Sequence, residues 1–145
     1  MKNMLFLLAL GITLMASKCN EKSAMDLSHI PNLKDTRWVL SSLAGEAVNL
    51  PDGAEAFLIL DPEAKSVNGS GGCNNLFGAM ELEGESLSFN SLGATKKYCE
   101  GLMDTEKGFM DAMRNTKSFS FDENGLLNLL GDKGKVLAAL NKVAP

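Results

Sequence analysis

The sequence predicts an α+β fold: a mostly antiparallel β-sheet curled into a half-open barrel, with one α-helix packed against it. Three observations support this fold class: short segments that alternate apolar and polar residues, glycine-containing turns between those segments, and a single stretch with helical spacing. At 145 residues, the chain is long enough for one domain with a hydrophobic core. A continuous antiparallel sheet with short turns tends to curl and close, because closure removes exposed edge strands.

The first half of the domain is predicted to form short strands. Residues 36–40 are β-prone, and Trp38 and Leu40 share one face of the segment. A short return strand is expected over 46–50, where a Pro-Asp-Gly turn stops it. Residues 56–60, AFLIL, are a continuous apolar run, which predicts a buried strand.

Two hairpins are predicted further along the chain. Residues 77–89 alternate apolar and polar side chains on both sides of a glycine turn, and residues 118–130 do the same around Asn124-Gly125. Asn-Gly is a strong hairpin signal, because both central residues of its turn adopt positive φ. Residues 135–143 suit a strand or a helix. We favour a strand, because a tight turn precedes them and a barrel needs closing.

One helix is predicted between the two hairpins. Asp104 or Thr105 can cap it, and Glu106 in its first turn suits the positive end of the helix dipole. The helix has one apolar stripe, which indicates a core-facing side rather than a ligand groove, formed by Phe109, Met110 and Met113.

The N-terminus predicts export. A basic start precedes an apolar run over 4–15, which is shorter than the roughly 20 residues needed to cross a bilayer and is typical of a secretory signal. Cys19 follows a small-residue stretch that resembles the lipobox of bacterial lipoproteins, where cleavage before the cysteine exposes it to lipidation. Lys18 stands where a lipobox has a small residue. We expect a lipid on Cys19 that anchors the chain to the outer membrane of the cell envelope.

The chain therefore divides into a signal peptide (1–18), a flexible tether (19–33) and one domain (34–145). The tether is polar and carries the single histidine of the chain, His29, for which we expect solvent exposure and no function. The domain is expected to be a monomer.

Residues 69–78, GSGGCNNLFG, suggest a ligand loop, a reactive thiol or a bend in the sheet. Nucleophilic catalysis needs a base beside the thiol of Cys73, and the one histidine lies in the tether. Two cysteines and a distant histidine do not make a zinc site, and the glycines lack the Gly-Lys-Ser/Thr of a phosphate loop. A net charge of −4 without a basic stripe argues against nucleic acid as a partner. The sequence thus predicts no catalytic residue, metal or cofactor.

Three segments in order carry a family resemblance: residues 38–40, residues 69–78, and residues 94–99 before the helix. They resemble the META domain (HslJ-like) family, and the resemblance covers nearly all of residues 33–140. Two residues separate Asn74 from Phe77, about one more than in the family pattern. The residues that match the family motif are Trp38, Gly69, Gly72, Cys73, Asn74, Phe77, Gly78, Thr95 and Cys99.

The resemblance implies a small α+β domain whose antiparallel sheet forms a half-barrel with one helix, in proteins that are commonly secreted or lipid-anchored. It implies no catalytic residues, and it points to a role in the envelope or in stress. Residues 69–78 are then best interpreted as a corner of the fold. Glycines permit positive φ at a sharp bend, and Asn74 and Asn75 tolerate the left-handed region.

Export affects the state of the cysteines. With Cys19 lipidated, Cys73 and Cys99 are left as an even pair in an oxidising compartment. A disulfide between them would close a loop of about 25 residues and stabilise the fold by about 3–4 kcal/mol. The alternative is two free thiols, buried as small hydrophobic side chains.

Two function classes stay open. One is a non-catalytic envelope lipoprotein that binds a protein partner, or an apolar ligand inside its barrel. The other is a structural domain that stabilises the envelope without a specific ligand, and an enzyme is a distant third. A cavity inside the sheet would favour the first class and a fully packed core the second. The residues expected to line such a cavity are Leu58, Leu60, Phe89, Phe119 and Phe121.

Overall fold

The computed structural model describes residues 33–34 and 36–143. The predicted signal peptide, the lipidation site Cys19 and the tether histidine His29 lie outside the described residues. No helix in the described part has the length and apolar character needed to cross a membrane. The elements in chain order are β1 (Arg37–Leu43), β2 (Glu46–Ala47), β3 (Ala56–Asp61), β4 (Ser66–Gly71), β5 (Asn75–Glu83), β6 (Ser86–Ala94), α1 (Met103–Asn115), β7 (Ser118–Phe121), β8 (Leu127–Leu130), a 3₁₀-helix (Asp132–Gly134) and β9 (Val136–Val143).

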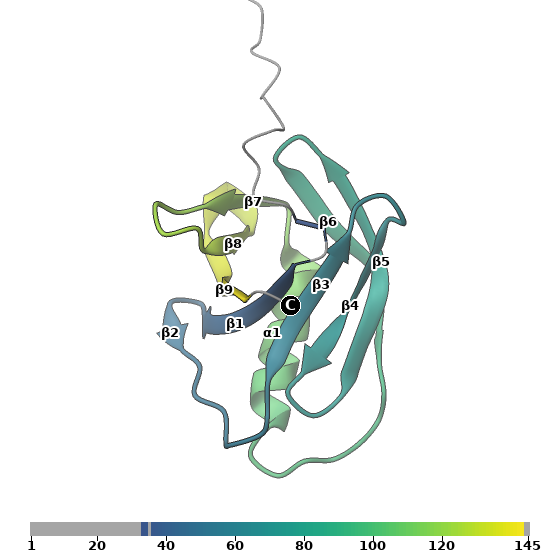
Figure 1. Ribbon diagram of the computed structural model, residues 1–145, viewed down its shortest axis with the longest axis vertical. Helices are drawn as coiled ribbons and strands as arrows, with labels where there is room; N and C mark the ends of the chain where they lie inside the picture. Colours follow the sequence, from purple (N-terminus) through teal and green to yellow (C-terminus); the bar gives the residue numbers. More distant parts are fainter. Residues whose placement is uncertain (1–32, 35, 144–145) are drawn as a thin grey trace, which may run out of the picture.

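The strands form one antiparallel sheet that closes into a barrel. The sheet order is β2-β1-β3-β4-β5-β6-β7-β8-β9, and β1 also pairs with β9, from Arg37–Val143 to Leu43–Ala138. Eight strands therefore complete the ring, and β2 extends it as a short arm on β1 (Figure 1). Within the described residues, β6 and β7 share the single pair Ser86–Ser118, so the ring is thinnest there.

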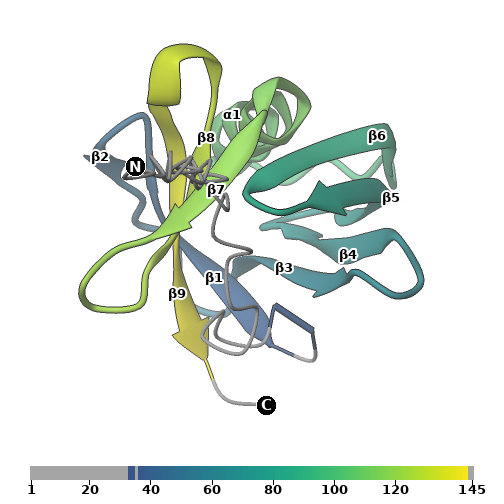
Figure 2. The ribbon, with the colours of Figure 1, turned by 90° about the horizontal axis from the view of Figure 1, so that it is seen from above.

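The helix α1 lies where the ring is thinnest. It connects β6 to β7 and lies between β6 and β8 when the barrel is seen from above (Figure 2). It contacts β4 and β6 on one side of the barrel and β1, β8 and β9 on the other. Its predicted stripe faces the core, and the side chains of Phe109 and Met113 are completely buried there. The helix thus covers the weakly paired part of the ring, between β6 and β7, and supplies one wall of the core.

The core is built around an aromatic cluster. Trp38 is fully buried, and its ring centroid lies 5.7 Å from that of Phe121, which lies 5.7 Å from that of Phe119. The indole N–H of Trp38 has no hydrogen-bond partner among the described residues. Trp38 therefore contributes through apolar packing between β1 and β7.

The predicted α+β class is confirmed, as are both hairpins. The hairpins form β5–β6 and β7–β8, and the ambiguous segment 135–143 forms β9, the strand that closes the barrel. The return strand predicted over 46–50 is shorter than expected and covers Glu46–Ala47.

The predicted strand over 56–60 is confirmed, but it is buried on one face only. β3 alternates between the two faces of the sheet, with Ala56, Leu58 and Leu60 inside and Ile59 39% exposed. Because α1 does not cover the outer face of β3, the apolar side chain of Ile59 on that face meets solvent.

Two predictions about local structure, the helix cap and the Asn124-Gly125 turn, are wrong. The helix begins after Leu102, which makes no side-chain capping bond, and Asp104 and Thr105 lie within its first turn. A tight turn, in which the Leu102 N–H donates to the Cys99 carbonyl at 3.2 Å, starts the helix early. In the β7–β8 turn, positive φ occurs at Gly125 and not at Asn124. The carboxyl group of Asp122 organises this turn instead, by accepting the N–H of Asn124 at 2.9 Å.

Candidate functional site

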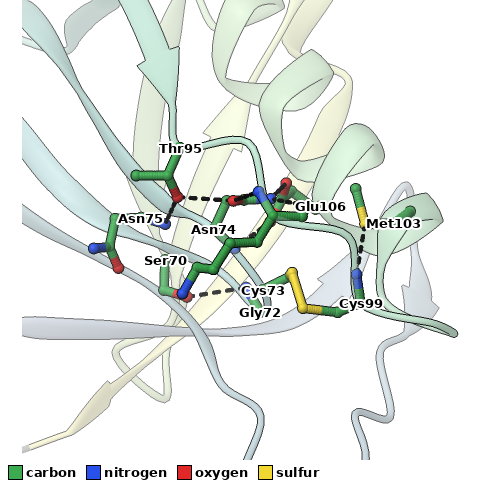
Figure 3. Close-up of a disulfide and its surroundings, with 10 residues drawn as sticks. Ser70, Gly72, Cys73, Asn74, Asn75, Thr95, Cys99, Met103 and Glu106 are labelled. Carbon is green, nitrogen blue, oxygen red and sulfur yellow. Dashed lines mark hydrogen bonds between the residues drawn. A yellow bond between two sulfur atoms is a disulfide. The ribbon is translucent and has the colours of Figure 1, made fainter.

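The cysteine motif forms a stapled corner, which we define as residues 69–75 together with residues 95–102. A disulfide joins Cys73, in the turn between β4 and β5, to Cys99, in the segment that leads into α1 (Figure 3). Their Cα atoms lie 5.9 Å apart, across 26 positions of sequence. The expected cysteine pair is therefore bonded in the structure, and it ties the sheet corner to the start of the helix.

Asn74 is the centre of the stapled corner and is 1% exposed. Its side-chain amide donates to the Lys97 carbonyl at 2.9 Å and to Oε1 of Glu106 at 2.7 Å. Its Oδ1 accepts the Thr95 hydroxyl and the Lys97 N–H, each at 2.7 Å (Figure 3). Both donors and both acceptor positions of the amide are used, so this one side chain connects three segments of the chain.

Glu106 is the second buried polar residue at the corner and is 7% exposed. Its Oε2 accepts the backbone N–H of Asn74 at 2.7 Å, while Oε1 accepts the Asn74 amide. No cation pairs with it among the described residues. The two donors from Asn74, together with its place in the first turn of α1, offset the cost of burying the carboxyl group.

Glycines make room for these contacts. A Cβ on Gly71 would overlap the side chain of Glu106, and a Cβ on Gly69 would overlap the carbonyl of Phe57 on β3. Gly72 has a φ of 108°, in the region that favours glycine. The predicted left-handed conformation of Asn74 and Asn75 is wrong, because Gly72 alone provides positive φ in this turn, and Asn74 is required for its hydrogen bonds instead.

The last part of the motif lies outside the corner. Phe77 projects from the outer face of β5, 49% exposed, and its ring lies over Gly93 on β6. A Cβ on Gly93 would come 2.6 Å from Phe77 Cε2, and one on Gly78 would come 2.8 Å from Leu92 Cδ2. Phe77 and Gly78 therefore fix the packing of β5 against β6, while Trp38 belongs to the core.

An exposed loop completes the corner. Lys96, Lys97 and Tyr98 are exposed, and the side chain of Tyr98 is 81% exposed. Their backbone is fixed on both sides, because Asn74 bonds the N–H and carbonyl of Lys97 and the disulfide holds Cys99. The Cys99 N–H also donates to the Met103 sulfur at 3.4 Å. We call residues 96–98 the Tyr98 loop.

The stapled corner thus contains six of the nine predicted motif residues: Gly69, Gly72, Cys73, Asn74, Thr95 and Cys99. Sequence reasoning missed Glu106 as their partner, although a signal was present. Glu106 lies three, four and seven positions before the predicted apolar stripe of the helix, so it falls on the buried face. No pattern in the sequence indicated the exposure of Tyr98.

Comparison with known proteins identifies the family. The family model described as META domain matches residues 31–144. The chain belongs to the META domain family. It is similar to a protein from Burkholderia xenovorans solved by NMR, with a TM-score of 0.62 and 27% identity over 78% of this chain and 85% of that one. A second NMR structure shares the fold, with a TM-score of 0.59 and 21% identity over 74% of this chain and 89% of the other. No curated protein matches the chain.

Two features of this META domain bear on ligand binding: the placement of its potential metal ligands and the packing of its core. In the described part of the chain, no group of three or more His, Cys, Asp or Glu side chains is placed to hold a metal ion. Of the five residues expected to line an internal cavity, four are buried in one core cluster, and Phe121 packs against that cluster. The two hollows described below lie on the surface and touch none of these five residues.

Proposed function

We propose that this META domain is a non-catalytic, exported protein of the cell envelope, anchored by a lipid on Cys19, which binds a protein partner through the Tyr98 loop. The observation that carries the proposal is the exposure of the Tyr98 side chain on a backbone that Asn74 and the disulfide hold in place. A tyrosine on a fixed backbone loses little conformational entropy on binding, and tyrosine is enriched among interface hot spots.

Export is supported by the signal-like N-terminus and by the disulfide, since disulfides persist mainly in oxidising compartments. The placement of the loop fits an anchored protein. Lys34, next to the point where the tether joins the domain, forms a β-bridge with Leu60 near the end of β3, whereas Ala56 at the start of β3 pairs with Gly71 of the stapled corner. A tether attached at Leu33 therefore begins near the end of β3 that is opposite the stapled corner, which carries the Tyr98 loop.

The chemistry of the loop suggests the kind of partner surface. Lys96 and Lys97 are exposed beside Tyr98 in a chain whose net charge is −4. A pocket for the tyrosine ring, bordered by acidic groups, would complement this loop.

The packed core favours a second candidate, a structural domain that stabilises the envelope without a ligand. Leu58 and Leu60 have no exposed surface, and Phe89 and Phe119 are buried with them. This packing argues against an apolar ligand inside the barrel and leaves the outer surface as the place where a partner could bind.

Site-specific photo-crosslinking in living cells tests the proposal. A crosslinking amino acid at position 98 should give a discrete adduct, whereas the same group at Glu81, an exposed position on β5, should give none. Adducts that are equal at both positions, or absent from both, would favour the structural candidate. Labelling with a fatty-acid analogue tests the anchor separately, and unchanged labelling of the Cys19→Ala variant would exclude Cys19 as its site.

A further inference from the structure

A groove runs along the solvent side of α1, between that helix and the end of β1 with β2; we call it the α1 groove. It consists of two hollows of about 430 Å³ and about 230 Å³ that share Leu43. The larger hollow lies between Val48 and the first turn of α1, at Asp104 and Thr105. The smaller hollow lies between Leu137 on β9 and the middle of α1.

The floor of the smaller hollow is apolar and is shaped by small residues. Along the helix it is formed by Gly108 and Ala112, which lie on the side of α1 next to its core-facing stripe. Glycine is disfavoured inside a helix. Here a Cβ on Gly108 would lie 3.1 Å from Leu43 Cδ1. Glycine therefore allows β1 to approach the helix, and no side chain at position 108 fills the hollow.

The rim of the larger hollow is acidic. Glu46 and Asp104 line the larger hollow from opposite sides, both are exposed, and neither forms an ion pair among the described residues. Asp111 borders the smaller hollow, where Lys107 and Arg114 pair with it. The unpaired negative charge is therefore concentrated around the larger hollow.

We propose that the α1 groove binds a basic amphipathic segment of another protein. Apolar side chains of that segment would occupy the hollows on either side of Leu43, and its lysines or arginines would reach Glu46 and Asp104. Such an amphipathic segment in an apolar groove is a recurrent mode of peptide recognition. Charge complementarity favours this occupant over a second copy that docks groove to groove, because two such grooves would bring the same acidic residues together. The proposal does not depend on the Tyr98 loop.

A binding assay with a defined peptide tests the proposal. The probe is a fluorescent peptide of leucine and lysine with helical amphipathic spacing, and a version with glutamate in place of lysine is the negative control. The Glu46→Lys/Asp104→Lys variant should bind the basic probe about tenfold more weakly, because two favourable charge contacts become repulsive. The matched control is Glu83→Lys/Glu85→Lys, which makes the same charge change at the β5–β6 turn and should bind as the wild type does.

A second pair of variants tests the apolar part without changing charge. Ala47→Phe places a ring in the larger hollow and should weaken binding of the probe at least severalfold, whereas Ala79→Phe, at an exposed position on β5, should not. Equal weakening by both charge variants would overturn the proposal in favour of general electrostatic attraction. Sedimentation that shows a dimer, which Ala47→Phe dissociates, would overturn it in favour of a second copy. A cooperative unfolding transition and a wild-type circular dichroism spectrum confirm that each variant is folded.

Discussion

Asn74 and Glu106 are joined by two hydrogen bonds of 2.7 Å, one from the backbone N–H and one from the side-chain amide of Asn74, across 32 positions of sequence. The pair connects the turn between β4 and β5 to the first turn of α1, and the disulfide reinforces the same connection. The part of the family motif that lies in the stapled corner is therefore explained by a structural joint, and next to this joint Tyr98 is exposed to solvent.

Replacing Asn74 should show how much the joint contributes to stability. Asn74→Ala keeps the backbone N–H donor to Glu106 but removes the side-chain donor, and it leaves the N–H and carbonyl of Lys97 without their partners in a buried setting. We expect the free energy of unfolding to fall by about 3 kcal/mol or more. Urea denaturation of the oxidised protein measures the loss.

The neighbouring residue provides the control for this experiment. Asn75 is exposed, and its backbone forms its hydrogen bonds with Thr95: the Asn75 N–H donates to the Thr95 hydroxyl, and the Asn75 carbonyl accepts the Thr95 N–H. Asn75→Ala should therefore change the unfolding free energy by less than about 0.5 kcal/mol. If both alanine variants lost the same amount, the stapled corner would not depend on Asn74.

Glu106→Gln tests the other half of the pair. Glutamine keeps the shape of the side chain but turns one of two acceptor oxygens into an NH₂ group that faces an N–H of Asn74. We expect a loss of about 1–3 kcal/mol. Asp104→Asn removes an exposed carboxyl group from the same helix turn and should cost at most about 1 kcal/mol, through the helix dipole alone. Equal losses would mean that Glu106 acts only through the dipole.

Much of the fold could be predicted because its signals are local. The alternation around Trp38 and Leu40 and the glycine turns of the two hairpins are properties of adjacent residues, so period and turn chemistry were sufficient. The closing strand β9 followed from a topological argument, since the sheet needs a partner for its first strand.

The joint could not be predicted from local signals. Asn74 and Glu106 meet only when the β4–β5 turn and α1 are packed together, and the absence of a Cβ on Gly71 makes sense only in that contact. The error at Asn74 has the same origin. The glycine-rich turn suggested a left-handed conformation for both asparagines. Gly72 adopts the positive φ instead, and Asn74 forms hydrogen bonds.

The ion pairs of Asp111 predict how the stability of the domain changes at acidic pH. The hydrogen bond from Lys107, aided by the charges of Lys107 and Arg114, holds the pKa of Asp111 below its ordinary value despite some desolvation. Because this pKa is lower in the folded than in the unfolded chain, the ionised group stabilises the fold at neutral pH, and the contribution disappears as pH falls through the folded pKa. Asp111→Asn should therefore lower the melting temperature slightly at neutral pH and have no effect in strong acid.

Salt provides the control for that prediction. The ion pairs of Asp111 are exposed, so about 1 M salt should screen them and reduce the difference between wild type and variant at neutral pH. A difference that persists in acid and in high salt would indicate a change in helix propensity instead.

Loss of the disulfide should destabilise the domain without changing its architecture. Opening a loop of 26 positions costs about 3–4 kcal/mol in the chain-entropy model, while Asn74 and Glu106 still hold the corner. The Cys73→Ser/Cys99→Ser variant should unfold at lower urea concentration with an unchanged circular dichroism spectrum, and its stability should match that of the wild type in reducing agent. In the oxidised wild type, mass spectrometry of non-reduced peptides should show the 73–99 crosslink. Two alkylatable thiols in the exported protein, or equal stability with and without reductant, would show that the staple does not support the fold.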